Sequence, residues 1–391
     1  MRLKEMMEYG DMKSLQSLDK NVCSNCFYDK EIICYIEKNG TYESCSYCKP
    51  KYQSEKAIGF DELMEFLCRG IYHFYDDAAN AGLTFETGEG GYQGKHFSSF
   101  ELIYEEIGLG AASDKLLTDI IRTLPQFARC KKDPFTLDKN KELIYDWKRF
   151  ADLLKHSVRY SFFRTRQFDT PDRMAPSDIL REIALSVDKL DLIKTIKKGD
   201  AIFRSRQHAV SETPGTIYDL GAPDLKYCLY SNRMSPAGIP MFYGAFDAVT
   251  AEAEVIDLSS IKTKPNLTTG KFILEKDLQV INLCSLPETP GMFDDERRSL
   301  RYTTLFLKEF VCEISKEIKR DGHEHIEYVP TQVVTEYFRF VLPEIAHFDI
   351  NGIIYPSAKK EGERNCVLFF DNKGCRSIFS LAPDNVKTRI I

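Results

Sequence analysis

The stretch from Asn232 to Glu254 brings together three side chains with complementary chemistry, Arg233, Tyr243 and Glu254. The planar fork of an arginine matches the geometry of a diphosphate, and the face of a tyrosine favours a positively charged ring. A carboxylate stabilises the oxocarbenium-like centre that forms when a glycosidic bond breaks. If the three side chains converge on one cleft, they suit a nucleotide whose sugar carries a cationic leaving group.

The local sequence also predicts the elements that position these side chains. Ser235-Pro236-Ala237-Gly238 is typical of a tight turn, and Ile239–Phe246 is apolar and aromatic enough for a buried strand. Thr250 is expected to cap the helix that carries Glu254 in its first turns. A second interpretation stays open on residue types alone, in which the tyrosine belongs to the core and the two charges form a surface pair.

The same stretch resembles the central motif of the RES domain family, in which R-x-N-P-x-G-x-P-x-x-Y-x-A is followed by T-A-x-x-E. The first run is R-M-S-P-A-G-I-P-M-F-Y-G-A here, from Arg233 to Ala245, and Ser235 replaces the more common Asn. The second run is T-A-E-A-E, from Thr250 to Glu254.

Three further runs resemble motifs of that family. The first family arginine, in a Y/F-R-x-R strand, matches Arg204 in the sequence I-F-R-S-R that ends at Arg206. The family serine, in a P-S turn followed by N-x-V/L-x-F, matches Ser357 and the run N-C-V-L-F-F that begins at Asn365. A Y-x-x-T-Q run of one subgroup matches Y-V-P-T-Q, which ends at Gln332. The motifs occur in the expected order over about half of the chain.

The resemblance implies a fold similar to ADP-ribosyltransferases and an activity that degrades NAD, as in bacterial toxins of toxin–antitoxin pairs. Arg204 and Arg233 would hold the diphosphate, Tyr243 would stack on nicotinamide, Glu254 would stabilise the ribosyl cation, and Ser357 would bind the nicotinamide ribose or amide. Arg206, Gln332 and Asn365 are also expected to contact NAD. Two structural alternatives stay open: the Y-V-P-T-Q run serves only to start a helix with Thr331 as its cap, or Asn365 holds the Ser357 turn and does not touch the ligand.

Four cysteines near the start of the chain predict a structural zinc site. Their spacing is C-x₂-C-x₁₈-C-x₂-C, at Cys23, Cys26, Cys45 and Cys48. Each pair can present two thiolates to one metal, and four protein ligands leave no open position for a substrate. The alternative is four reduced cysteines in a loose segment. Between the pairs, Glu31–Glu37 is expected to form a short strand that ends in a hairpin turn at Lys38-Asn39-Gly40.

Composition restricts the compartment and the partners. The formal net charge of −6 argues against charge-driven binding to nucleic acid. The chain has no apolar run long enough to cross a bilayer, and its N-terminus lacks the apolar core of a signal peptide, so we expect a cytoplasmic protein without a membrane partner. Twelve cysteines in such a chain indicate metal binding or free thiols.

The 391 residues predict an α+β protein of three parts: a zinc module at 1–55, a mostly helical domain at 56–195 and an α+β RES domain at 196–391. Lys194–Gly199 is interpreted as the linker before the last domain. Four amphipathic helices are expected before it: Gly59–Ala78, Ser113–Leu124, Lys139–Arg164 and Pro176–Ile193. Beyond it, short strands are expected to alternate with helices, and the last predicted strand is Arg376–Leu381.

Two other functions stay open. Arg149 and His156 resemble the R-x₄₋₆-H signature of HEPN ribonucleases, and the helical layout is similar to RES proteins with a HEPN-like N-terminal domain. The protein would then be a ribonuclease with a nucleotide-sensing RES domain. The third hypothesis is a non-catalytic protein that binds partners.

For an NAD-consuming enzyme, the acceptor can be water, phosphate or a macromolecule. An antitoxin or regulatory protein is the expected protein partner, and an oligomer stays open.

Overall fold

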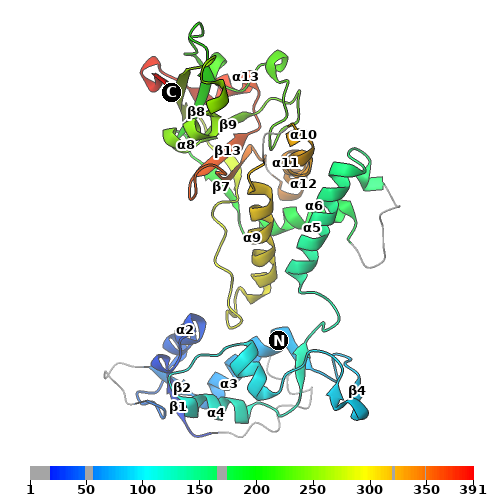
Figure 1. Cartoon of the computed structure of the whole chain (residues 1–391). Helices are drawn as coiled ribbons and strands as arrows, with labels where there is room; N and C mark the ends of the chain where they lie inside the picture. The colour runs from blue at the N-terminus through cyan, green and yellow to red at the C-terminus, as the bar shows by residue number, and fades with distance from the viewer. Residues whose placement is uncertain (1–17, 49–55, 165–173, 319–321, 348) are drawn as a thin grey trace. The chain divides into compact units, whose positions relative to one another are not determined.

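The computed structural model describes residues 18–48, 56–164, 174–318, 322–347 and 349–391, which form two compact units (Figure 1). Unit 1 comprises Met1–Asp138 and Pro290–Arg301. Unit 2 comprises Lys139–Thr289 and Tyr302–Ile391. The α+β fold class is confirmed, with a cysteine cluster near the N-terminus and a large mixed sheet in the C-terminal region.

Unit 1 is built mainly from helices around a core that includes Phe60, Leu63 and Leu67 of one amphipathic helix. Its elements are β1 (Asn21–Cys23), a 3₁₀ turn (Ser24–Cys26), α2 (Lys30–Asn39), β2 (Ala57–Gly59), α3 (Phe60–Phe74), β3 (Tyr75–Asp77), β4 (Phe85–Glu86), a 3₁₀ turn (Thr87–Glu89), β5 (Gly91–Tyr92), a π-helix (Glu101–Glu106), α4 (Asp114–Thr123) and β6 (Arg129–Lys131). Strands pair antiparallel as β1 with β2, β3 with β6 and β4 with β5.

The strand and hairpin predicted at residues 31–40 were wrong, because this segment is helix α2. The Asp29 side chain accepts hydrogen bonds from the amides of Glu31 and Ile32 and so caps the helix. Ile32 and Ile36, four residues apart, are both buried, as expected for one face of a helix. The Asp29 cap and the i, i+4 pair of Ile32 and Ile36 therefore favour a helix over the expected strand.

A segment from the C-terminal half, Pro290–Arg301, belongs to unit 1. Phe293 is buried in the core of this unit, 6.2 Å from the ring of Phe66. Gly70 permits this approach, since a Cβ atom there would lie 2.7 Å from the Phe293 ring. Arg69 forms a 3.1 Å ion pair with Asp295. The chain therefore leaves unit 2 after β11 and returns to it with α9.

Unit 2 contains the large sheet and the remaining helices. Its elements are α5 (Lys139–His156), a 3₁₀ turn (Phe162–Arg164), α6 (Pro176–Lys189), β7 (Ile193–Ile196), β8 (Ala201–His208), α7 (Ile217–Leu220), a 3₁₀ turn (Leu225–Tyr227), β9 (Phe242–Ala245), α8 (Ala248–Val255), a 3₁₀ turn (Leu258–Ser260), β10 (Asn266–Leu274), β11 (Leu278–Asn282), α9 (Arg301–Ser315), α10 (Glu324–Glu327), α11 (Val329–Phe340), α12 (Leu342–Ala346), β12 (Gly352–Pro356), β13 (Arg364–Leu368), α13 (Asn372–Ile378), β14 (Phe379–Ser380), a 3₁₀ turn (Pro383–Asn385) and β15 (Val386–Ile390).

Within the described part of the chain, nine strands form one sheet in the order β14-β10-β8-β9-β13-β12-β11-β7, with β15 also paired to β10. The β11 and β12 strands run parallel, while their neighbours pair antiparallel. Phe242, Phe272 and Phe379 pack together in the core of this sheet, with ring centroids 4.7 to 5.2 Å apart. This arrangement places β8, β9 and β13, which carry the family motifs, next to one another.

Two predictions for unit 2 were wrong in secondary structure. The expected linker at Lys194–Gly199 overlaps β7, which pairs with β11 at one edge of the sheet. The expected strand Arg376–Leu381 is wrong over its first half, because Arg376–Ile378 belong to helix α13, whereas Phe379–Ser380 form strand β14. The Asp371 side chain accepts from the Gly374 amide and caps this helix. Cys375 consequently lies in a helix. The three predicted domains stay a prediction, and α5 and α6 group with the sheet in unit 2.

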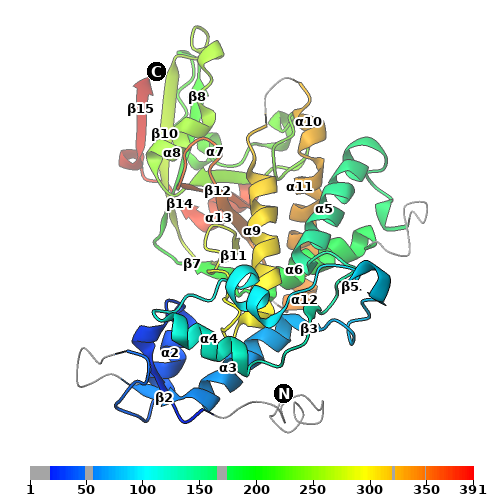
Figure 2. The ribbon, with the colours of Figure 1, turned by 60° about the horizontal axis from the view of Figure 1, so that its bottom comes forward.

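Helices α5, α9 and α11 lie side by side in both views of unit 2 (Figures 1 and 2). Trp147 of α5 packs edge-on against Phe310 of α9, with ring centroids 4.9 Å apart. No helix in the described ranges is long and apolar enough to cross a membrane.

Candidate active site

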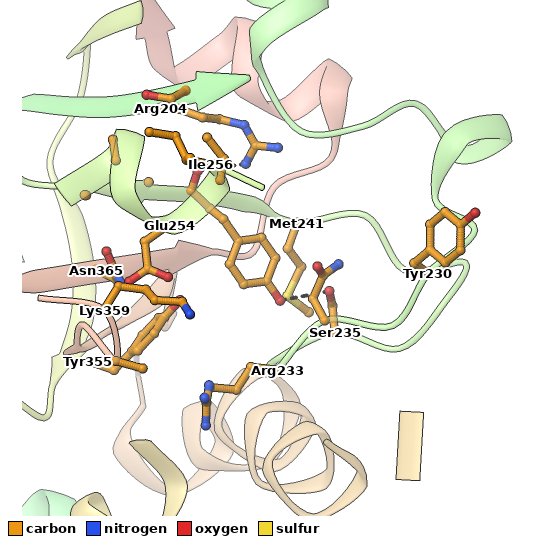
Figure 3. Close-up of a pocket in the computed structure, with 18 of the residues that line it drawn as sticks. Arg204, Tyr230, Arg233, Ser235, Met241, Glu254, Ile256, Tyr355, Lys359 and Asn365 are labelled. Atoms are coloured by element: carbon orange, nitrogen blue, oxygen red, sulfur yellow. Dashed lines mark hydrogen bonds between the residues drawn. The ribbon is translucent and has the colours of Figure 1, made fainter. Parts of the chain in front are cut away.

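A cavity of about 730 Å³ lies in unit 2, in the size range of small-molecule sites (Figure 3). It is lined by residues of β8, β9, α8 and the loops that follow β12 and precede β9. Five of the predicted site residues line it: Arg204, Arg233, Tyr243, Glu254 and Asn365. Segments that are up to 161 positions apart in sequence therefore meet at one place.

Glu254 lies near the C-terminal end of α8. The helix begins after Asp247, whose side chain accepts from the Thr250 amide at 2.8 Å, so the predicted cap at Thr250 was wrong. Glu254 Oε1 accepts two hydrogen bonds, from Ser357 Oγ at 2.6 Å and from Asn365 Nδ2 at 2.7 Å. Oε2 has no hydrogen-bond partner among the residues that the structure describes. The carboxylate is thus fixed through one oxygen and keeps the other for a ligand.

Ser357 is placed to orient Glu254. Its Oγ donates to the carboxylate and accepts from the backbone amides of Lys359 at 3.2 Å and Lys360 at 3.1 Å. Ser357 is not among the residues that line the cavity, whereas Asn365 is. The alternative prediction for Asn365 was that it holds the serine turn. In the structure Asn365 instead supports the Glu254 carboxylate, to which its side chain donates.

Tyr243 presents its ring to the cavity from β9. Its hydroxyl shares a 2.9 Å hydrogen bond with Ser235 Oγ, drawn in Figure 3, and accepts from the Met234 amide at 3.3 Å. Burial raises the pKa of the Tyr243 phenol above its ordinary value, so the hydroxyl stays protonated. Both ends of the side chain are therefore fixed, and the ring has a defined orientation for stacking.

Arg204 and Arg233, which were predicted to bind the diphosphate, both donate hydrogen bonds to backbone carbonyls of the protein. Arg204 donates from Nη1 to the Tyr243 carbonyl at 2.7 Å, and its guanidinium lies 5.3 Å from the Phe242 ring centroid. Burial lowers the pKa of Arg204, which nevertheless stays charged because arginine does not deprotonate in proteins. Arg233 donates from both Nη atoms to the end of α9, to the carbonyls of Ile314 at 2.6 Å and Lys316 at 2.7 Å.

Two protein-family models match parts of this chain. The RES domain model matches residues 213–379, and a model described as HEPN/RES N-terminal domain 1 matches residues 38–168. Residues 213–379 are therefore similar to RES domains. The match includes Arg233, Tyr243 and Glu254 but begins after Arg204, whose assignment stays a prediction from the motif. No curated protein matches the chain.

Besides Ser357, two predicted residues of the RES domain site do not line its cavity. Arg206 is exposed and forms a 3.3 Å ion pair with Glu212, beside a separate cavity of about 320 Å³. Gln332 is buried and donates to the carbonyls of Asn232 at 2.8 Å and Ser235 at 3.3 Å. It therefore supports the turn that holds the Tyr243 hydroxyl.

Thr331 also supports this turn, and its predicted role as a helix cap was wrong. Helix α11 begins two residues earlier, at Val329. The Thr331 hydroxyl, which can donate only one proton, lies 2.7 Å from the Arg233 carbonyl and 2.8 Å from the Tyr328 carbonyl. The turn is therefore anchored on α11 through two neighbouring side chains.

The sequence prediction missed several residues that line the cavity. Lys359 lies two positions after Ser357, and its ammonium pairs with Glu317. Tyr355 is buried next to the P-S turn, and burial raises the pKa of its phenol well above the ordinary value. Tyr230 lies on the loop before the R-x-S-P run, at the far side of the site in Figure 3. A basic residue beside the serine turn was the available signal for Lys359, while none marked Tyr230.

The residues of the predicted nuclease pair have separate partners. Arg149 donates to the Met174 carbonyl at 3.0 Å and lies 3.8 Å from an Asp146 carboxylate oxygen. The His156 side chain is 59 % exposed and lies 3.8 Å from Asp152 on the same helix. Neither residue lines the two cavities described above. The contacts of Arg149 and His156 among the described residues therefore do not favour a ribonuclease site.

The four predicted metal ligands converge in unit 1. The Sγ atoms of Cys23, Cys26, Cys45 and Cys48 all lie within 4.8 Å of one another. Three of the separations are 3.3, 3.6 and 3.8 Å. Zinc bound to four thiolates at about 2.3 Å requires sulfur atoms roughly 3.8 Å apart in a tetrahedron, so the cluster fits this ion. Cys34, which lies between the two pairs in sequence, is exposed and outside the cluster.

The second cysteine pair is tied to the helices of unit 1. The Tyr47 amide donates to Cys45 Sγ at 3.4 Å, the kind of contact that orients a thiolate ligand. The Tyr47 hydroxyl donates to Asp119 of α4 at 2.7 Å, and Lys20 pairs with the same carboxylate. The contact of Tyr47 therefore ties the pair that ends at Cys48 to α4.

Proposed function

We propose that the RES domain degrades NAD by cleaving the bond between nicotinamide and ribose. The observation that carries this proposal is the Glu254 carboxylate, which is fixed through Oε1 and has no partner at Oε2 among the described residues, in a cavity that Tyr243 also lines. A cation at the ribose and a cationic ring before cleavage are the charges that these two groups favour. The match to the RES domain model supports the same substrate.

In the proposed reaction the N-glycosidic bond breaks and its electron pair moves to the pyridinium nitrogen. Nicotinamide leaves as a neutral molecule, so no general acid has to protonate it. The positive charge passes to the ribosyl centre, where the Glu254 carboxylate stabilises it. Arg204 lines the cavity from β8 with a fixed positive charge and is the group expected to contact the diphosphate.

The acceptor decides the class of enzyme. Attack by water, with loss of one proton, makes the protein an NAD glycohydrolase, and attack by inorganic phosphate makes it an NAD phosphorylase. Attack by a side chain or a nucleic acid makes it an ADP-ribosyltransferase. We propose the first two, because the site is a cavity in which small molecules reach the reacting centre. Lys359, which lines the same cavity, is the residue expected to attract phosphate.

The experiment uses the purified full chain with NAD, in buffers with and without phosphate. Mass spectrometry should detect nicotinamide together with ADP-ribose, or with ADP-ribose phosphorylated at its anomeric carbon when phosphate is present. His156→Ala should leave the rate unchanged. Intact NAD in all conditions, together with cleavage of RNA that His156→Ala abolishes, would refute the proposal in favour of the ribonuclease.

We also propose that the cysteine cluster holds one zinc ion and that the protein acts as a toxin or defence effector controlled by an antitoxin or regulatory protein. Cys23, Cys26, Cys45 and Cys48 would hold the ion, which fixes the fold of unit 1 and takes no part in NAD cleavage. Expression of the wild type should lower cellular NAD and arrest growth, and expression of Glu254→Gln should not. A cytoplasmic location stays a prediction.

A further inference from the structure

The loop before the central motif exposes an unusual amount of apolar surface. Leu225, Tyr227, Leu229 and Tyr230 are 65, 66, 67 and 80 % exposed, all within six positions. Exposed aromatic groups that gather at a cavity mark ligand contacts more often than isolated ones do. Two of the four, Tyr227 and Tyr230, line the cavity that contains Glu254.

The backbone of this loop is held on both sides of Tyr230. Buried Asn372 donates to the Ala222 carbonyl at 2.8 Å, and the Gly238 amide donates to the Cys228 carbonyl at 2.8 Å. Gly238 has φ +85°, which a side chain would strain. Gln332 fixes the carbonyl of Asn232. A fixed backbone that carries a free ring can bind a planar ligand without paying much ordering entropy.

Tyr230 differs from its neighbour in having a free ring. The Lys226 ammonium lies 4.8 Å from the centroid of the Tyr227 ring and covers it. Among the described residues, Tyr230 has no hydrogen-bond, ring or cation partner. Figure 3 shows it across the cavity from Glu254, with Met241 and Ser235 between. The site thus has an anionic end at Glu254 and an aromatic end at Tyr230.

We propose that Tyr230 stacks on the adenine ring of NAD and so makes the enzyme prefer the whole dinucleotide to its nicotinamide half. This inference rests on the proposed function, which places nicotinamide and its ribose at Glu254. A dinucleotide carries a second planar base at its other end, and an aromatic face binds such a base through stacking. Adenine on Tyr230 also covers the most exposed side chain of the loop.

The test compares Tyr230→Ala, Tyr230→Phe and a control, Leu229→Ala, which is equally placed on the loop but does not line the cavity. The measured quantities are the KM of NAD and the inhibition constants of adenosine monophosphate and nicotinamide mononucleotide as competitors. Tyr230→Ala should raise the KM of NAD and the inhibition constant of adenosine monophosphate by about tenfold, within the range known for loss of base stacking. Nicotinamide mononucleotide should be unaffected, and Tyr230→Phe should behave as the wild type.

Equal effects of Tyr230→Ala on the two half-molecules, or no effect on NAD, would overturn the adenine assignment. The second result would instead favour docking of a protein partner on the loop. If the wild type consumes no NAD, the proposed function fails, and calorimetric binding of adenosine monophosphate to wild type and Tyr230→Ala then decides the adenine assignment separately. Equal affinities in that titration would refute it.

Discussion

Replacing Glu254 with glutamine removes one charge and leaves the local hydrogen bonds in place. The amide oxygen of the new side chain can accept from Ser357 and Asn365, as Oε1 does now at 2.6 and 2.7 Å. The amide nitrogen then takes the position of Oε2, which has no partner in the described part of the protein. The expected change in folding stability is therefore small, about 0.5 kcal/mol or less.

The change in rate should be large. Opposite unit charges about 4 Å apart interact by about 4 kcal/mol at an effective dielectric constant of about 20. Measured losses of one preorganised electrostatic contact are about 2.7–4 kcal/mol, or a hundred- to a thousandfold in rate. Binding of NAD should weaken less, since the ground state carries its positive charge on the nicotinamide ring and not on the ribose.

Single-turnover release of nicotinamide measures the chemical step, and calorimetry measures NAD binding to the same preparations. Ser357→Ala is the matched variant, because it removes one of the two hydrogen bonds to Glu254 Oε1 and keeps the charge. It should slow the reaction by about tenfold, the value of one hydrogen bond of about 1.4 kcal/mol. A Glu254→Gln protein that melts like the wild type and retains its rate within about threefold would refute the assignment of the carboxylate.

Three further outcomes test the scaffold. Freshly purified, reduced protein should contain about one zinc per chain, and elemental analysis that finds none would contradict the metal site. Arg233→Lys should lower the free energy of unfolding by about 1.5–3 kcal/mol in urea titrations, because lysine cannot cap α9 with two charged hydrogen bonds; exposed Arg206→Lys is the control, and equal losses would show that the cap is unimportant. Gly70→Ala should cost about 1–3 kcal/mol in the same titration through overpacking against Phe293, and an unchanged midpoint would show that the segment yields.

Local chemistry explains which elements were predictable. The turn at Ser235–Gly238 and the strand after it follow from proline, glycine and a continuous apolar run, and the structure contains both. Helices α3, α4 and α6 show the helical spacing of apolar residues and were predicted to within a few positions. The cysteine cluster was predictable because its ligands come in two short, matched pairs.

Long-range partners explain the failures. The carbonyls that occupy Arg233 lie 81 and 83 positions away, and nothing in the motif marks the end of α9 as their location. The return of residues 290–301 to unit 1 depends on Phe293 and Gly70, which are separated by more than 200 positions. Asp29 and Asp371 each accept from backbone amides and cap a helix in or before a segment that the sequence predicted as a strand.

The contacts divide the motif residues into two groups with different duties. Gln332 and Thr331 bond to the backbone of the turn that begins at Asn232, and that turn fixes the hydroxyl of Tyr243. Ser357 and Asn365 likewise bond to a single oxygen of Glu254.

Most of the motif therefore positions two groups, an aromatic face and a carboxylate, whose side chains line the cavity. Preorganisation of this kind lowers the cost of orienting charge at the moment of reaction. It follows that substitutions among the supporting residues should change the rate through the geometry of Glu254 or Tyr243. A conservative substitution that restores the hydrogen bond, such as Ser357→Thr, should then recover activity that Ser357→Ala loses.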